Sequence, residues 1–155
     1  QIFIGDEETD RKLRWSDFRG PVDQSSPHHA MTTWLMEYSM DEIKTYGDSV
    51  HIGKLIVKVK MDPAKSWCIQ HKTTDELLKH EQGHFDIAIL CMKEFMSIYR
   101  QTTFRRNNVD QQMQKIFSDM MNKYHQLGID YDRETEHSHN TEAQKHWNLF
   151  FAKYL

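Results

Sequence analysis

The alternation of hydrophobic and polar residues predicts strands in the first half of the chain. In residues 53–62 (GKLIVKVKMD), aliphatic side chains alternate with lysines, and a proline follows directly. A two-residue period is typical of a half-buried strand, and proline ends such a strand. Residues 30–40 (AMTTWLMEYSM) are rich in Thr, Trp and Tyr, which favours a second strand. We also expect a short extended run over residues 11–20, a loop over 21–29 and a short apolar segment over 66–69.

The second half changes to a period of three and four residues, which predicts helices. The longest candidate covers residues 74–104, and Thr73 or Thr74 is a suitable N-cap. Its apolar positions form one stripe, as on a helix that packs against a core. Two histidines interrupt this otherwise apolar stripe. The stripe consists of Leu77, His80, His84, Ala88, Cys91, Phe95 and Ile98.

Two further helices are expected after the long one. The first covers residues 108–128, and Gly128 is the expected stop signal. A polar loop over residues 129–140 follows, and residues 141–155 form the last helix. The fold class predicted from this order is α+β, with an N-terminal antiparallel or mixed sheet, one long helix and two further helices.

The composition is that of a globular domain and does not indicate an activity. The 155 residues fit one domain, residues 1–155, with 38% hydrophobic and 28% charged residues. A net charge of -3 predicts no binding to nucleic acid. No apolar run reaches the roughly 20 residues that span a bilayer, so we expect no stable membrane insertion. The chain starts at Gln1, which either removal of a secretory signal or trimming would explain.

The segment HEQGHFD, residues 80–86, is the strongest chemical signal. His80 and His84 are four residues apart, so their imidazoles lie on one helix face and can reach one Zn²⁺ ion. Glu81 projects toward a water on that ion and would act as the general base. The short pattern HExxH also arises by chance. Here the pair lies on the apolar stripe, where two unpaired imidazoles would be poorly solvated, and this favours a metal site.

A catalytic zinc site needs a third protein ligand, and the polar loop over residues 129–140 is the expected source. Gly83, inside the motif, leaves room for a close approach from another part of the chain. The candidates in the loop are Asp132, Glu134, Glu136, His137 and His139.

Read together, these segments resemble the DUF922 family of bacterial proteins, described as secreted or periplasmic zinc-dependent proteases. The resemblance extends over nearly the whole chain, and the seven-residue HEQGHFD string is far more specific than HExxH. One position departs from the family pattern, because Ser138 stands where the family has glycine. The matching positions are Trp15, Phe18, Gly20, Ser66, Trp67, residues 80–86, Tyr131, Asp132, Glu134, Thr135, His137, Gln144 and Trp147.

The resemblance implies a small zincin-like domain with the sheet packed on the active-site helix. It implies His80 and His84 as zinc ligands, Glu81 as the base and His137 as the third ligand. Because Ser138 and His139 follow, His139 stays open as the alternative ligand. It also implies a periplasmic or extracellular location, with a signal peptide removed.

The leading hypothesis is therefore a zinc metallopeptidase that cleaves peptide or protein substrates through zinc-activated water. Tyr131 is a candidate for stabilising the oxyanion of the intermediate, although packing under a loop is the commoner role of such a tyrosine. A non-catalytic, zinc-stabilised binding module at the cell envelope is the alternative, and a helical binding protein without metal is the third. Cys91 is expected to be buried beneath the site, and a bridge to Cys68 stays open. The oligomeric state does not follow from the sequence.

Overall fold

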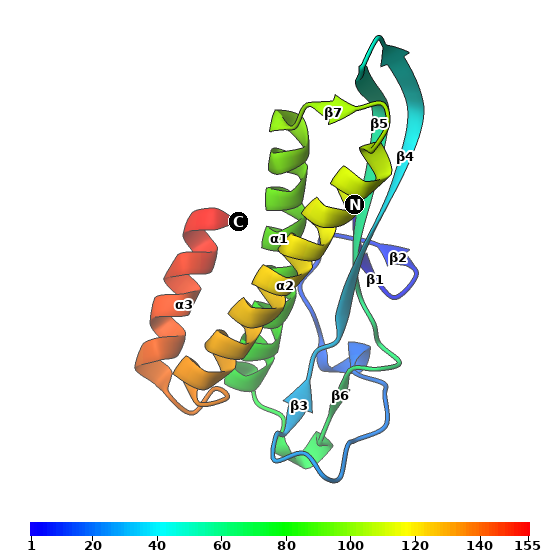
Figure 1. Ribbon diagram of the computed structural model, residues 1–155. Coiled ribbons are helices and arrows are strands. Elements are labelled where there is room, and N and C mark those ends of the chain that lie inside the picture. The colour runs from blue at the N-terminus through cyan, green and yellow to red at the C-terminus, as the bar shows by residue number, and fades with distance from the viewer.

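The computed structural model describes residues 1–155 and has an α+β fold, as the sequence predicts. A mixed sheet has the strand order β2-β1-β5-β4, and a short strand β7 pairs with the start of β5. Of the three helices, α1 packs directly on this sheet, and α3 lies on the far side of α1 from it (Figure 1). A separate two-stranded sheet, β3 with β6, lies at the end of the molecule that carries the candidate site. The strands are β1 (Ile2–Ile4), β2 (Glu7–Glu8), β3 (Ala30–Met31), β4 (Trp34–Tyr46), β5 (Ser49–Met61), β6 (Trp67–Cys68) and β7 (Phe104–Arg105), and the helices are α1 (Asp75–Gln101), α2 (Val109–Thr135) and α3 (Thr141–Tyr154).

The strands β4 and β5 form a long antiparallel hairpin, which is the main body of the sheet. Gly47 adopts a positive φ of 58° in the two-residue turn between them, a conformation that glycine allows without steric cost. In β5, Val57, Val59 and Met61 are at most 4% exposed, while Lys58 and Lys60 between them are partly exposed on the other face. The predicted alternation is confirmed, and it directs one face of β5 toward the helices.

Helix α1 begins where the sequence predicts. The side chain of Thr74 accepts a hydrogen bond from the Leu77 backbone N–H, so Thr74 is the N-cap. Ala88, Cys91 and Phe95 on the predicted stripe are completely buried. Cys68 and Cys91 are both free thiols, and burial raises the pKa of Cys91 to about 12. The stripe therefore forms the core-facing side of α1, as expected.

Helix α2 is longer than predicted, and the expected loop over residues 129–140 is wrong for most of its length. Gly128 does not end the helix, which continues through Tyr131 and Asp132 to Thr135. The cause is tertiary burial, because Tyr131 and Thr135 in the added turns are completely buried. Burial of this size outweighs the roughly 1 kcal/mol that a glycine costs inside a helix. The connection to α3 is left with only residues 136–140.

The extended run predicted over residues 11–20 is also wrong in its second part, where Trp15–Asp17 form one 3-10 turn. The carboxylate of Asp17 accepts hydrogen bonds from the Arg14 backbone N–H and from the Arg11 guanidinium, and these bonds fold the segment back on itself. Residues 21–29 form the predicted loop. None of the three helices combines the length and the apolar character that spanning a bilayer requires.

Candidate metal centre

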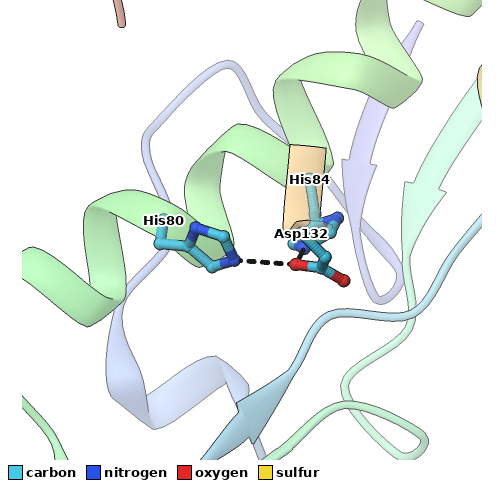
Figure 2. Close-up of side chains that lie close together, drawn as sticks. All are labelled: His80, His84 and Asp132. Atoms are coloured by element: carbon cyan, nitrogen blue, oxygen red, sulfur yellow. Dashed lines mark hydrogen bonds and ion pairs between the residues drawn. The ribbon is translucent and has the colours of Figure 1, made fainter. Parts of the chain in front are cut away.

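The two motif histidines meet an aspartate from the neighbouring helix. His80 and His84 point from α1 toward Asp132 of α2, as Figure 2 shows. The Nε2 atom of His80 lies 2.9 Å from Asp132 Oδ1, and that of His84 lies 2.8 Å from the same oxygen. The three ligand atoms lie within 4.8 Å of one another, so the group could hold one metal ion. The side chain of His80 is 2% exposed, that of His84 15% and that of Asp132 30%.

A hydrogen-bond chain beneath His80 determines which of its ring nitrogens holds a proton. The backbone carbonyl of His80 can only accept, so the Tyr131 hydroxyl donates to it over 3.0 Å. The Tyr131 oxygen in turn accepts from the Gln144 amide nitrogen over 2.8 Å. The Gln144 carbonyl oxygen therefore faces His80 Nδ1, at 2.9 Å. Because that oxygen is an acceptor, Nδ1 must carry the proton.

This arrangement leaves the other nitrogen of His80 ready to bind a cation. With Nδ1 protonated, a neutral His80 has a lone pair on Nε2, which faces the Asp132 oxygen at 2.9 Å. Two acceptors at that distance repel one another unless a proton or a metal ion lies between them. Metal-ligating histidines characteristically donate their second ring nitrogen to an oxygen in this way. The donor set thus fits a metal ion that prefers imidazole and carboxylate ligands.

The charges around the pair also favour a cation. Burial opposes the protonated form of His84, but the hydrogen bond with Asp132 and the charges of Glu81 and Asp132 outweigh it and raise the His84 pKa. Burial likewise opposes the ionised form of Asp132, yet its bonds to both histidines hold the Asp132 pKa well below its usual value. Asp132 is therefore ionised near neutral pH, and the site has a negative field.

Tyr131 supports the site from below. Its ring is completely buried and stacks on His80, with ring centroids 4.5 Å apart and an interplanar angle of 14°. It does not line the cavity in front of the histidines. The close approach that Gly83 allows is to this ring, because a Cβ at Gly83 would lie 2.3 Å from the Tyr131 hydroxyl oxygen. The geometry thus places Tyr131 where it orients His80, and its predicted role at an oxyanion stays a prediction.

Glu81 lies beside the histidines and lines the same cavity. This cavity has a volume of about 760 Å³ and also contains His80, His84 and Asp132 in its wall. The Glu81 side chain is 3% exposed and accepts a hydrogen bond of 2.5 Å from the hydroxyl of Thr32, which follows β3. A carboxylate held by one hydroxyl retains free lone pairs to accept a proton. Glu81 is thus placed as a base requires, and its role as the base stays a prediction.

His137 lies at the edge of the group, in the short connection between α2 and α3. Its Nδ1 is 3.6 Å from Asp132 Oδ1, and its side chain is 44% exposed. His139 lines the same cavity but makes no polar contact with the group. The group of three that could hold a metal contains Asp132 in the place expected for His137. The assignment of the third ligand to His137 remains a prediction.

Two other residues of the HEQGHFD segment hold the N-terminal loop. The Gln82 side-chain oxygen accepts from the Leu13 backbone N–H over 2.7 Å, and its amide donates to Asp86 over 2.8 Å. Asp86 also pairs with Lys12 at 3.5 Å, and burial raises its pKa. These contacts lie on the opposite side of α1 from the histidines, so two of the seven motif residues hold the N-terminal loop.

Sequence reasoning did not assign Asp132, Gln144 and Thr32 to the site. Asp132 was one of several candidates in an expected loop, and its true place follows only from the continuation of α2. A helical spacing from Tyr131 through Thr135 would have placed Asp132 on one turn, next to the residues that pack on α1. Gln144, on α3, was marked only by its match to the family pattern, and Thr32, after β3, shows no local signal that could have identified it.

Comparison with known proteins agrees with the resemblance in the sequence. A family model described as "Bacterial protein of unknown function (DUF922)" matches residues 6–140. This range contains His80, His84, Glu81 and Asp132. No curated protein and no solved structure matches the chain significantly. The description of the matched family assigns no activity.

Proposed function

The chain belongs to the DUF922 family of bacterial proteins, whose function is unknown, and we propose that it is a zinc-dependent metallopeptidase. The observation that supports this most is the convergence of His80 Nε2, His84 Nε2 and an ionised Asp132 oxygen at the wall of a cavity, with Glu81 beside them. A purely structural metal site has no use for an adjacent carboxylate that is not a ligand.

Zinc is the metal that the donor set favours. Two imidazoles and one carboxylate are the ligand set of known catalytic zinc sites, and three protein ligands leave a position open. Carboxylate-rich, all-oxygen sites suit magnesium or calcium instead, and thiolates are absent from this group. In this proposal His80, His84 and Asp132 hold the ion, and His137 is the alternative third ligand.

Bound zinc supplies a Lewis acid that lowers the pKa of water and polarises a carbonyl. The protein supplies the remaining parts. Glu81 accepts the proton of the attacking water and passes it to the leaving amine. Thr32 orients Glu81 by its hydrogen bond, and the contacts of Gln144 and Tyr131 orient His80. Most of the ligand set is shielded from solvent by its neighbours, which strengthens these electrostatic effects.

The size of the cavity favours a polymeric substrate. Residues 27–32, which include β3, form part of its wall, and its volume of about 760 Å³ is large enough for several side chains. A peptide or protein substrate fits these dimensions. We propose a periplasmic or extracellular location for the activity, in line with the resemblance to secreted proteins.

The test is a comparison of three zinc-loaded proteins on a mixed peptide library read by mass spectrometry. Glu81→Gln keeps the shape of the side chain but cannot accept the proton, so cleavage should fall by about 10²–10⁴-fold while zinc content stays at the wild-type level. Glu142→Gln, an exposed glutamate on α3, is the control and should cleave like the wild type. Equal cleavage by Glu81→Gln and wild type would reject Glu81 as the base. Zinc-loaded wild type that cleaves nothing would favour the binding module.

A further inference from the structure

A second cavity lies on the side of α1 that faces away from the metal centre. Its volume is about 590 Å³, and its wall comes from the first half of α1, the last two turns of α3 and the N-terminal loop. The α1 residues Gln82 and Asp86 in this wall follow His80 and His84 by two positions each, so they project from the opposite face of the helix. Neither the two histidines nor Glu81 lines this cavity.

The wall of this cavity is suited to an apolar ligand. Five of its eleven residues are hydrophobic, and they come from three separate parts of the chain. Cavities of roughly 300–1,000 Å³ that combine an apolar wall with a few fixed polar groups are typical of sites for small organic molecules. The hydrophobic residues of the wall are Leu13, Leu78, Phe151, Ala152 and Leu155.

Asp86 places a buried carboxylate in this wall. Its side chain is only 8% exposed. The Oδ1 atom accepts a hydrogen bond of 2.8 Å from the Gln82 amide, whereas Oδ2 has no hydrogen bond and no ion pair within the protein. No fully buried side-chain oxygen of the molecule lacks a partner, so Oδ2 is open to the cavity that Asp86 lines. This oxygen is therefore free to accept a hydrogen bond from a ligand.

Lys12 does not satisfy this carboxylate. The Lys12 ammonium lies 3.5 Å from Asp86 Oδ1, which is longer than the roughly 2.7–2.9 Å of a charge-assisted hydrogen bond. The Lys12 side chain is 71% exposed, and an ammonium group so well solvated contributes little to an ion pair. The charge of Asp86 is thus paired weakly at one oxygen and not at all at the other.

We propose that this cavity binds an organic ammonium group that carries an apolar chain, with the ammonium on Asp86 Oδ2 and the chain against Leu78 and Phe151. The ammonium supplies the hydrogen-bond donors and the positive charge that Oδ2 lacks. An uncharged apolar ligand would displace water from Oδ2 without replacing its hydrogen bonds, which is unfavourable, and Asp86 would repel a carboxylate. Both a free amine and the amino end of a peptide have the required chemistry. The inference goes beyond the proposed function, because it requires neither a metal ion nor peptidase activity.

The experiment titrates the ¹⁵N-labelled protein with n-hexylamine near neutral pH and follows the backbone amide signals of residues 12–13 and 148–155. Two probes of the same chain length are compared with it: 1-hexanol, which is uncharged, and hexanoate, which has the opposite charge. Hexylamine should bind about 10-fold more tightly than hexanol, and hexanoate should bind more weakly than both. Leucine amide and its N-acetyl derivative test the amino end of a peptide, and only the form with the free amine should bind.

Three variants test the position of the ligand. Asp86→Asn keeps the shape of the side chain and the acceptor for Gln82, so it should fold, but its affinity for hexylamine should fall by about 10–100-fold while that for hexanol stays the same. Asp119→Asn, at an exposed position on α2, is the control and should bind hexylamine like the wild type. Ala152→Phe adds volume to the cavity from an exposed position on α3, so it should weaken the binding of both probes.

Equal affinity of the wild type and Asp86→Asn for hexylamine would overturn the proposal. The same conclusion would follow if hexylamine bound no more tightly than hexanol, or if neither probe shifted the signals of residues 12–13 and 148–155. Should Asp86→Asn fail to fold, the comparison of the probes on the wild type and on Ala152→Phe still decides whether the cavity binds a charged amine.

Discussion

Gly83 of α1 and Tyr131 of α2 approach so closely that no side chain fits between them. A Cβ at Gly83 would lie 2.3 Å from the Tyr131 hydroxyl oxygen and 2.7 Å from the ring carbon that bears it. The same tyrosine stacks on His80 and donates to its backbone carbonyl. The contact that packs α1 against α2 therefore also orients His80, a candidate metal ligand.

Gly83→Ala should destabilise the protein even though alanine is the better helix former. Alanine gains about 1 kcal/mol in helix propensity, but the overpacked contact with Tyr131 should cost about 1–3 kcal/mol more than that gain. Because Tyr131 must move, zinc affinity should fall as well. Denaturant unfolding and zinc titration measure the two effects.

Gly128→Ala is the matched control, since it is also an interior helix glycine facing the site. Its added Cβ would meet only His84 Nδ1 at 3.8 Å, an ordinary contact. This variant should be up to about 1 kcal/mol more stable than the wild type. If both alanine variants were stabilised, the close Gly83–Tyr131 contact would be wrong.

Gln144→Met tests the positioning of His80. The substitution keeps the side-chain volume but removes the acceptor for His80 Nδ1. The proton is then no longer held on Nδ1, and Nε2 is no longer held as the nitrogen that binds the metal. Zinc affinity should fall by about 10–100-fold, the usual effect of losing such a partner. Competition with a chromophoric chelator measures it. Gln126→Met, at an exposed position on α2, should leave affinity unchanged, and an unchanged affinity in both variants would remove Gln144 from the site.

Ser138→Gly should stabilise the protein. Serine at a φ of 81° is strained, and glycine adopts this backbone conformation without that cost. The expected gain is about 1 kcal/mol, reduced by the greater entropy of glycine in the unfolded chain. Thermal unfolding of the metal-free protein shows it as a higher Tm. A lower Tm would mean that the loop is not held in the left-handed conformation.

Asp17 should make stability depend on pH. Burial would raise its pKa, but the hydrogen bonds from Arg11 and Arg14 and their charges outweigh burial and lower it. A carboxyl whose pKa is lower in the folded state stabilises the fold above its unfolded pKa of about 3.9, and this contribution is lost as pH falls through the folded value.

Asp17→Asn should therefore cost about 1.5–3 kcal/mol near neutral pH, where the ionised carboxylate is fully bonded. The difference from the wild type should shrink below about pH 4, as the wild-type carboxylate takes up a proton. Urea unfolding at pH 7, 5 and 3.5 follows it. A difference that did not change with pH would show that the hydrogen bonds, and not the charge, hold the turn.

The sequence alone determined the elements whose signals are local. The alternation of aliphatic residues with lysines placed β5, and the hydroxyl of Thr74 next to an apolar stripe placed the start of α1. The four-residue spacing of His80 and His84 put both imidazoles on one helix face, and the length of the HEQGHFD string identified the family. Each of these depends on residues within one or two helical turns or along a single strand.

Only the tertiary structure decided the rest of the site. Local glycine chemistry favoured an end of α2 at Gly128, but burial of Tyr131 and Thr135 against the other helices continued it and placed Asp132 before the histidines. Gln144 contacts His80, although 64 residues separate them in the sequence. His28 contacts His137 across 109 residues. Both pairs form only when the chain is packed. Contacts between residues so far apart in the sequence produce no periodic pattern of hydrophobic and polar residues. They form because folding buries surfaces from distant parts of the chain against one another.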